Sequence, residues 1–246
     1  MRDKNRLAPN LMTVFNLLLG FLAIVAAMKG NFTTAAWFIL IAAVCDFLDG
    51  KIARVTRGSS DFGIEFDSLA DVVSFGVAPA FLIYAAQMRE HEPVGLIVSF
   101  LPLAAGAVRL ARFNATTSNF EKRNFIGMPI PTAAGLLCSY VIFSQHFWDA
   151  VRFPIIITAL AVAASVLMVS TVEFEAMPKF SFRRGRKNTV LMLLLLLCLA
   201  TILIFPEKAL FPLTLGYILS QLGRAVVNYL RDDEEEPMPD VSISKH

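Results

Sequence analysis

The sequence predicts an all-α integral membrane protein, a helical bundle of about eight transmembrane helices with both termini in the cytoplasm. The first indication is composition: 56% of the 246 residues are hydrophobic and only 17% are charged, whereas about 25% are charged in a typical soluble domain. The second is that apolar residues occur in runs of about 20, enough to cross a hydrocarbon core of about 30 Å. The third is the uneven distribution of Lys and Arg between alternate loops.

Eight apolar segments account for these helices in chain order, namely 10–28, 33–53, 64–88, 94–113, 130–148, 154–171, 189–205 and 208–228. The first, fifth and seventh are the clearest. Acidic residues interrupt the second near its end, and the third and eighth also carry polar residues. Only Phe205-Pro206-Glu207-Lys208 separates the last two segments. This sequence is typical of a tight turn between two helices, although a single re-entrant helix is an alternative.

The orientation follows from the positive charges. With eight spans both termini lie on one side, and 18 of the 22 Lys and Arg residues fall on that side, leaving Lys29, Arg89, Arg152 and Lys208 on the other. The side richer in Lys and Arg is normally cytoplasmic. Basic loops beside spans are ordinary topology signals, so they do not indicate nucleic-acid binding. Residues 231–246 are polar and acidic and are predicted to form a disordered tail.

The second and third segments carry four aspartates that would otherwise be out of place in an apolar hairpin. Asp49 and Asp67 are equally far in sequence from Gly58 in the polar turn, and Asp46 and Asp71 are nearly so. In an antiparallel hairpin each pair should therefore lie at one height. Within each helix the spacings i, i+3 and i, i+4 place the two aspartates on one face. The sequence thus predicts that four carboxylates converge near the cytoplasmic end of two helices.

Such a cluster requires compensating positive charge. An Asp at the centre of a transmembrane helix costs about 2.5–3.5 kcal/mol, and four anions repel one another. Two divalent cations would balance four carboxylates, and all-oxygen ligands suit Mg²⁺ or Mn²⁺. Paired metals of this kind clamp a phosphoryl group during displacement. The alternative, that each Asp pairs with a nearby Arg or reaches to water, explains one such residue better than four at matched heights.

Small residues and one cation accompany the aspartates. Gly50, Ala53 and Gly63 would let a backbone or a ligand approach closely, although helix packing alone also explains them. Arg54 adds a positive charge suited to a phosphate oxygen. The alternative for Arg54 is an anchor at the cytoplasmic interface.

Together these residues form a pattern with eight fixed positions over 26 residues, Asp46-x₂-Asp49-Gly50-x₂-Ala53-Arg54-x₈-Gly63-x₃-Asp67-x₃-Asp71. The pattern resembles the signature of the CDP-alcohol phosphotransferase family. That resemblance implies a membrane enzyme whose six-helix core is here extended by two helices. Members of the family move a phosphatidyl-type group from a CDP-linked lipid to an alcohol and release CMP.

Three further segments resemble the branch of this family that makes phosphatidylserine. They are SLADVVSFGVAPA at 68–80, RLARFN at 109–114 and FIGMPIP at 125–131, where Met128 stands in place of an expected Leu. The resemblance implies that CDP-diacylglycerol and L-serine give phosphatidylserine and CMP. It also implies a single transmembrane catalytic domain over residues 1–230, in a multi-pass protein of the cell membrane. The site would lie at the cytoplasmic face, and the protein would be a homodimer.

The resemblance also implies residue roles. Two divalent cations, Mg²⁺ or Mn²⁺, would be bound by Asp46, Asp49, Asp67 and Asp71. Asp71 would in addition be the catalytic base. The CDP-lipid would be bound by Gly50, Ala53, Arg54 and Gly63.

Other polar residues in the spans are weaker candidates. Arg109 and Arg112 lie at i, i+3 near the cytoplasmic end of the fourth segment, where they would bind the serine carboxylate or a phosphate through forked donors. Their alternative is a pair of interfacial anchors. Thr13 and Asn16 would face the nucleotide or, as we favour, form a hydrogen bond between helices.

Rival functions make different predictions. Within the family, the acceptor would be another alcohol, such as glycerol phosphate or an inositol phosphate, or the donor would be an ether lipid. A cation transporter or channel would place acidic residues near mid-membrane and polar stripes on several helices. Here the acidic residues cluster at one end of one hairpin, which favours the enzyme.

Overall fold

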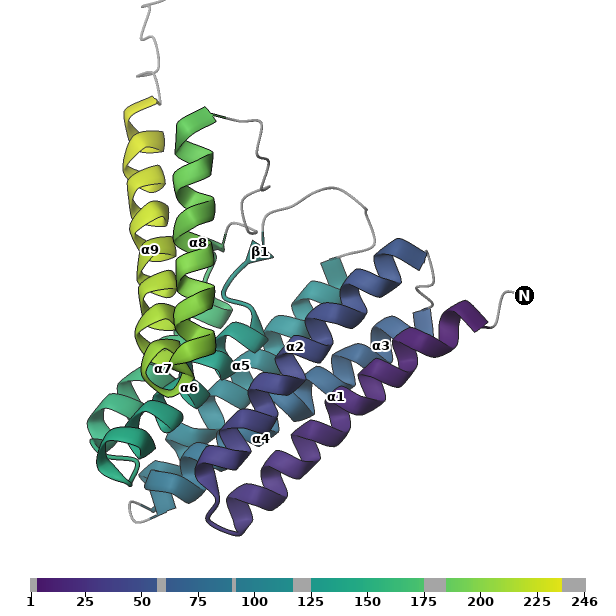
Figure 1. The fold of residues 1–246 in the computed structure, drawn as a ribbon, viewed down its shortest axis with the longest axis vertical. Coiled ribbons are helices and arrows are strands. Elements are labelled where there is room, and N and C mark those ends of the chain that lie inside the picture. The colour runs from purple at the N-terminus through teal and green to yellow at the C-terminus, as the bar shows by residue number, and fades with distance from the viewer. Residues whose placement is uncertain (1–3, 57–60, 90–91, 117–124, 175–184, 236–246) are drawn as a thin grey trace, which may run out of the picture.

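The protein is built from long helices (Figure 1). The computed structural model describes residues 4–56, 61–89, 92–116, 125–174 and 185–235. Their helices are α1 (Lys4–Met28), α2 (Phe32–Thr56), α3 (Asp61–Asp71), η1 (Val72–Val77), α4 (Ala78–Ile83), η2 (Tyr84–Met88), α5 (Val94–Thr116), α6 (Ile130–Trp148), α7 (Pro154–Val169), α8 (Gly185–Ile204) and α9 (Pro206–Glu235). Because α3, η1, α4 and η2 follow one another without a break, each of the eight predicted segments corresponds to one helical segment.

The expected all-helical fold needs one small correction. β1 (Phe125–Ile126) and β2 (Glu173–Phe174) form a short antiparallel ladder. A further backbone hydrogen bond extends the ladder, in which the Gly127 N–H donates to Val172 O at 2.9 Å. Gly127 has φ +77°, and a Cβ there would lie 2.4 Å from Met168 O. Glycine is therefore required where the loop after α5 crosses the end of α7.

Several helices have the length and composition of membrane spans. Among the described residues, four segments are long and apolar enough to cross a bilayer, namely Leu11–Met28, Phe62–Met88, Val94–Ala115 and Pro206–Asn228. Phe32–Leu48 and Pro154–Val169 are shorter apolar helices. These helices identify the chain as a membrane protein.

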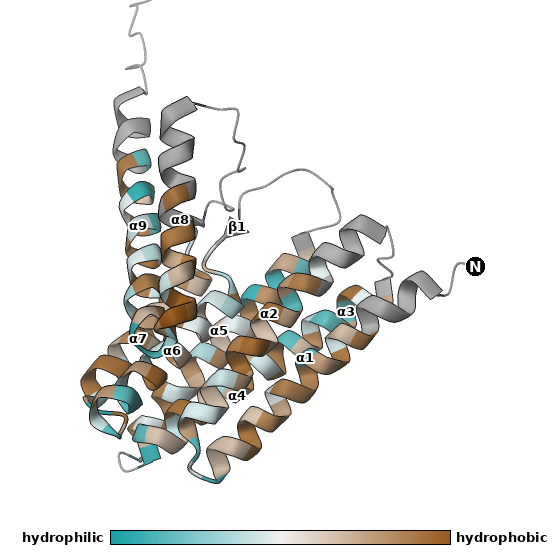
Figure 2. Ribbon diagram, in the orientation of Figure 1, coloured by the Kyte–Doolittle hydropathy of each residue, from teal (hydrophilic) through white to brown (hydrophobic). Residues whose placement is uncertain are grey.

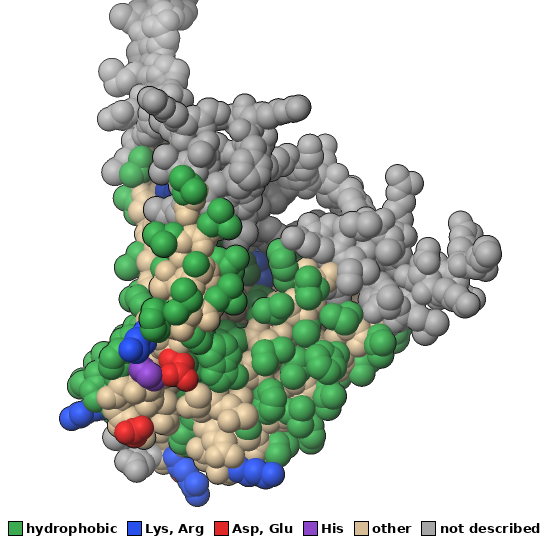
Figure 3. All heavy atoms as spheres, in the orientation of Figure 1, with side chains coloured by type: hydrophobic (Ala, Val, Ile, Leu, Met, Phe, Trp, Pro, Cys, Tyr) green, Lys and Arg blue, Asp and Glu red, His purple; other side chains and the backbone are tan. Residues whose placement is uncertain are grey.

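The side chains are distributed as in a membrane bundle. Many residues of the helices are hydrophobic (Figure 2), and hydrophobic side chains are spread over the described surface (Figure 3). Large ones such as Phe15 and Phe21 on α1 are exposed. The neighbouring helices α1 and α2 bury many alanines, namely Ala23, Ala26, Ala27, Ala35, Ala36 and Ala42. Small residues allow close helix contact where lipid removes the usual hydrophobic driving force.

The last two helices form a hairpin beside the main bundle (Figure 1). The predicted turn between them is confirmed, because α8 ends at Ile204 and α9 begins at Pro206. The Phe211 ring of α9 lies 5.2 Å from that of Tyr140 on α6, and His146 Nδ1 of α6 lies 2.5 Å from Glu207 Oε2. α9 continues as helix to Glu235, into the predicted tail, whereas residues 236–246 lie outside the described chain.

Candidate active site

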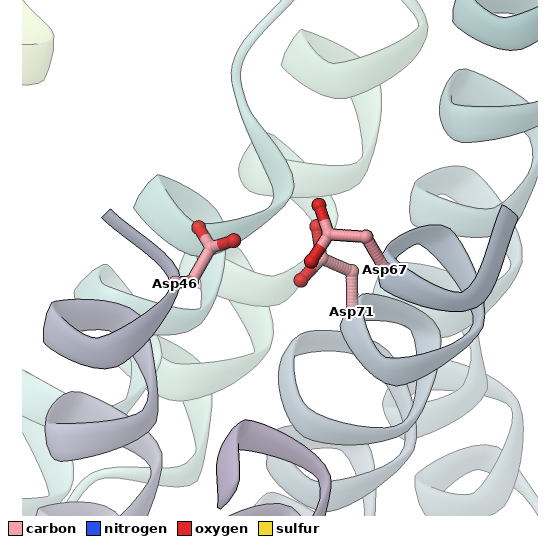
Figure 4. Close-up of side chains that lie close together, drawn as sticks. All are labelled: Asp46, Asp67 and Asp71. Carbon is pink, nitrogen blue, oxygen red and sulfur yellow. The ribbon is translucent and has the colours of Figure 1, made fainter. Parts of the chain in front are cut away.

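Three of the four predicted aspartates come together on neighbouring helices (Figure 4). Asp46 projects from α2, and Asp67 and Asp71 project from one face of α3. One carboxylate oxygen from each lies within 4.8 Å of the other two. The predicted convergence is therefore present for these three residues. Asp46 approaches both aspartates of α3, as the predicted convergence requires. The predicted pairing of Asp49 with Asp67 involves a side chain outside the described part of the structure.

The remaining residues of the pattern are placed less fully. Asp49, Ala53 and Arg54 belong to α2, but their side chains lie outside the described part of the structure. Among the described residues, a Cβ at Gly50 would meet nothing within 4 Å, which leaves room for a ligand on that side. Gly63 lies in the first turns of α3 and is partly exposed.

The cluster has the chemistry of a site for hard cations. Asp71 is nine-tenths buried, with 9% of its surface exposed. Asp67 Oδ1 is also buried and has no hydrogen-bond partner among the described residues. Gathering negative carboxylates away from water is costly unless a positive charge joins them. Carboxylate oxygens are preferred ligands of Mg²⁺ and Mn²⁺, so these residues fit a divalent cation.

Helix α1 contributes polar contacts to the same aspartates. The Asn16 Nδ2 donates to Asp71 Oδ1 at 3.3 Å. The Thr13 side chain is hydrogen-bonded to Asp67. The favoured prediction of a hydrogen bond between helices is confirmed for Asn16. The sequence did not identify the partner, and it missed Ser74 of η1, whose hydroxyl donates to the Asn16 backbone oxygen at 2.9 Å.

Helix α5 places its two candidate arginines differently. Arg109 is nine-tenths buried, interacts electrostatically with Asp71, and has an Nε without a hydrogen-bond partner among the described residues. Arg112 is exposed, and its Nη1 donates to the backbone oxygen of Val169 at 3.3 Å. Val169 ends α7, where helical carbonyls have no partner within the helix. Arg109 therefore lies at the aspartate cluster, and the hydrogen bond from Arg112 reaches the end of α7.

A second link from α5 reaches the residue next to Asp67. The Asn114 Nδ2 donates to Ser68 Oγ at 3.0 Å, and the Ser68 hydroxyl donates in turn to Ile64 O. Asn114 lies in the RLARFN segment and Ser68 opens the SLAD segment. Two motifs that are far apart in sequence thus meet beside the aspartate cluster.

The chain belongs to the CDP-alcohol phosphatidyltransferase family, whose model matches residues 6–172. This match runs from the first turn of α1 through α7 and ends before α8. The resemblance inferred from the aspartate pattern is therefore confirmed at the level of the family.

Individual relatives have more specific names. The CDP-diacylglycerol–serine O-phosphatidyltransferase of Helicobacter pylori is 38% identical over 206 residues, which cover 83% of this chain and 84% of that protein. The enzyme of the same name from Bacillus subtilis is 34% identical over 183 residues, covering 73% of this chain and 98% of that protein. The archaetidylserine synthase of Methanothermobacter thermautotrophicus is 37% identical over 169 residues, covering 68% of each.

Proposed function

We propose that this protein transfers the phosphatidyl group of CDP-diacylglycerol to the hydroxyl of L-serine, giving phosphatidylserine and CMP. The observation that carries the proposal is the convergence of Asp46, Asp67 and Asp71 in a chain whose relatives include enzymes named for this reaction. The motifs that contact the cluster, 68–80 and 109–114, are also those that resemble the serine-using branch.

The chemistry is a direct displacement at phosphorus. The serine oxygen forms a bond to the phosphorus that carries the diacylglycerol, the bond from that phosphorus to the CMP oxygen breaks, and Asp71 accepts the hydroxyl proton. Bound divalent cations, Mg²⁺ or Mn²⁺, supply charge neutralisation for the pyrophosphate. Burial of Asp71 limits access of water as a competing acceptor. No protein nucleophile is required.

The residues of the aspartate pattern would bind either the cations or the CDP-lipid. Asp46, Asp49, Asp67 and Asp71 would hold two divalent cations. Gly50, Ala53, Arg54 and Gly63 would line the site for the CDP-lipid. Support for this assignment is that no described residue would lie within 4 Å of a Cβ at Gly50.

The topology proposed with this function has eight spans and both termini in the cytoplasm, in a multi-pass protein of the cell membrane. Support comes from the sequence, in which an eight-span arrangement places 18 of the 22 Lys and Arg residues on one side (the lower edge of Figure 3, which also carries Lys and Arg side chains, would be the other side). The aspartate cluster would then lie toward the cytoplasmic face, where CDP and serine stay in water while the lipid tails stay in the bilayer. Residues 1–230 would form one catalytic domain, and we expect a homodimer.

The acceptor is tested by incubating purified protein with CDP-diacylglycerol, Mn²⁺ or Mg²⁺ and a panel of alcohols. We expect CMP release with L-serine and little with glycerol phosphate or an inositol phosphate. Because one relative is named an archaetidylserine synthase, the panel should include an ether-linked CDP-lipid. CMP release driven by another alcohol but not by serine would contradict the proposed acceptor, and cation flux into liposomes without any CDP-lipid would favour a transporter.

Arg109 is proposed to bind the serine carboxylate or a phosphate. Replacing Arg109 with Ala is expected to raise the KM for serine by about 10-fold or more, since charge-assisted hydrogen bonds contribute about 1.5–3 kcal/mol. The KM for CDP-diacylglycerol should change less. Steady-state kinetics with each substrate varied in turn measure both values.

Arg112→Ala is the matched comparison for Arg109→Ala, because it removes from the same helix an arginine whose side chain donates to the end of α7. Its KM for serine should stay near that of the wild type. Equal increases of both KM values in Arg109→Ala would argue for a phosphate-binding or structural role.

A further inference from the structure

Asn16 stands out among the buried polar residues because it contacts the site without belonging to the aspartate pattern. It is fully buried on α1, with 0% of its surface exposed, and the nearby Thr13 is 5% exposed. The two residues are separated by three positions and therefore share one face of the helix. That face meets both aspartates of α3, Thr13 at Asp67 and Asn16 at Asp71.

The backbone of Asn16 is itself fixed against the chain that follows Asp71. The Ser74 hydroxyl donates to the Asn16 backbone oxygen at 2.9 Å. Ser74 lies in the π-helical turn η1, which begins directly after Asp71 and in which the Ala78 N–H reaches back to Val73 O. Turns of this kind, inserted in α-helices, are frequent at functional sites.

A close approach of the two helices holds this contact in place. A Cβ on Gly20, one turn after Asn16, would lie 2.4 Å from Ser74 Oγ and 2.8 Å from Ser74 Cα. The absence of a side chain at Gly20 thus lets α1 and η1 pack with their backbones close together. The distance from Asn16 to Asp71 is consequently set by backbone packing and does not depend on flexible side chains alone.

Electrostatic interactions determine the orientation of the Asn16 side-chain amide. Its donor group points at Asp71 Oδ1, whereas its own Oδ1 is buried without a hydrogen-bond partner among the described residues. Turning the amide over would place an oxygen dipole against a carboxylate. A buried unpaired acceptor costs about 1–3 kcal/mol. The hydrogen bond that the Asn16 amide donates to Asp71 is therefore the contact that compensates for this cost.

We infer that Asn16 is a positioning residue for Asp71. Its amide holds one oxygen of the Asp71 carboxylate and so orients the other toward the cations and the acceptor hydroxyl. The inference rests on the proposed function in assigning Asp71 a proton-accepting role. It assigns to α1 a task in catalysis besides packing.

The principal test is Asn16→Leu, which keeps a similar volume and removes the donor. We expect kcat to fall about 10- to 100-fold, the effect of misplacing a catalytic group, while the KM values for CDP-diacylglycerol and serine stay within about 2-fold of wild type. Asn16→Ala serves as a second variant if the leucine is not accommodated. Ser139→Ala is the matched control, because Ser139 is equally buried but donates to Leu136 O within its own helix.

A second readout does not depend on the acceptor or on catalysis. Mn²⁺ should raise the thermal unfolding temperature of the substrate-free wild type, and the half-saturating Mn²⁺ concentration should be about 10-fold higher in Asn16→Leu than in wild type or Ser139→Ala. If wild type shows this response but uses an alcohol other than serine, the proposed acceptor fails and the role of Asn16 stands.

Three outcomes would overturn the positioning role. One is an unchanged kcat together with an unchanged Mn²⁺ response in a folded Asn16 variant. Another is an increase of either KM with kcat unchanged, which would make Asn16 a substrate contact. The third is a loss of kcat that Ser139→Ala reproduces, since that would reflect a general cost of altering buried polar groups.

Discussion

Replacing Asp71 with Asn should reduce the rate of CMP release by at least about 10²-fold, because a general base contributes about 10²- to 10⁴-fold and the same residue is expected to hold a cation. Asn has nearly the same shape as Asp but neither accepts the proton nor carries the charge. Folding should survive, since removing one of three neighbouring negative charges relieves repulsion in the cluster. The measurements are initial rates of CMP release, with size-exclusion and thermal unfolding in detergent to verify the fold.

Asp149→Asn supplies the matched control for this prediction. Asp149 is an exposed residue at the end of α6 with φ 51°, a backbone conformation that Asn tolerates well. It lies outside the aspartate cluster, so its activity should remain close to that of wild type. Retention of more than about a tenth of wild-type activity in Asp71→Asn would remove Asp71 from the role of base, given the magnitudes typical of such catalysis.

Removing divalent cations is expected to have an effect of similar size. Excess chelator should abolish CMP release, and added Mg²⁺ or Mn²⁺ should restore it, because three close carboxylates and a pyrophosphate repel one another without positive charge between them. The assay is CMP release in chelator-treated protein, with and without added metal.

Two further arms make the chelation experiment specific. Chelator already saturated with Mg²⁺ controls for any effect of the chelator itself on the detergent or the lipid. Asp46→Asn should need more Mn²⁺ for half-maximal activity than wild type, because it removes one of the three converging carboxylates. Undiminished catalysis in excess chelator would contradict a metal-assisted reaction.

The sequence predicted the helices well because length and apolarity dominate in a membrane. Each expected segment has a helical counterpart, and the turn at Phe205 separates α8 from α9 as predicted. The convergence of Asp46 with Asp67 and Asp71 was also predictable, since the symmetric spacing around Gly58 constrains an antiparallel hairpin. The same argument predicts that Asp49 joins the cluster, but the Asp49 side chain lies outside the described part of the structure.

Contacts between helices far apart in sequence were harder to predict. Asn16 and Asp71 are 55 positions apart, and their meeting depends on how α1 packs against α3 and η1. The polar pair Thr13 and Asn16 within an apolar span was a visible signal, but it identified no partner. Ser74 gave no such signal, because a serine in a transmembrane helix commonly bonds to its own backbone.

The two arginines of α5 show the limit of helical spacing as a guide. Their i, i+3 separation predicts one shared face, yet Arg109 is buried toward Asp71 and Arg112 reaches the end of α7. A long side chain near a helix terminus turns toward the nearest unpaired carbonyl. The position of the end of α7 relative to α5 depends on the fold and cannot be predicted from the sequence of either helix alone.

The central claim is that the aspartates of α2 and α3 together hold divalent cations. Its most direct test is to count bound Mn²⁺ by electron paramagnetic resonance in purified protein with CDP-diacylglycerol, comparing wild type with a variant in which Asp46, Asp67 and Asp71 are all Asn. We predict two bound Mn²⁺ per chain in wild type, as in paired-metal phosphoryl-transfer sites, and none above background in the variant. Equal Mn²⁺ binding by the two proteins would contradict the claim.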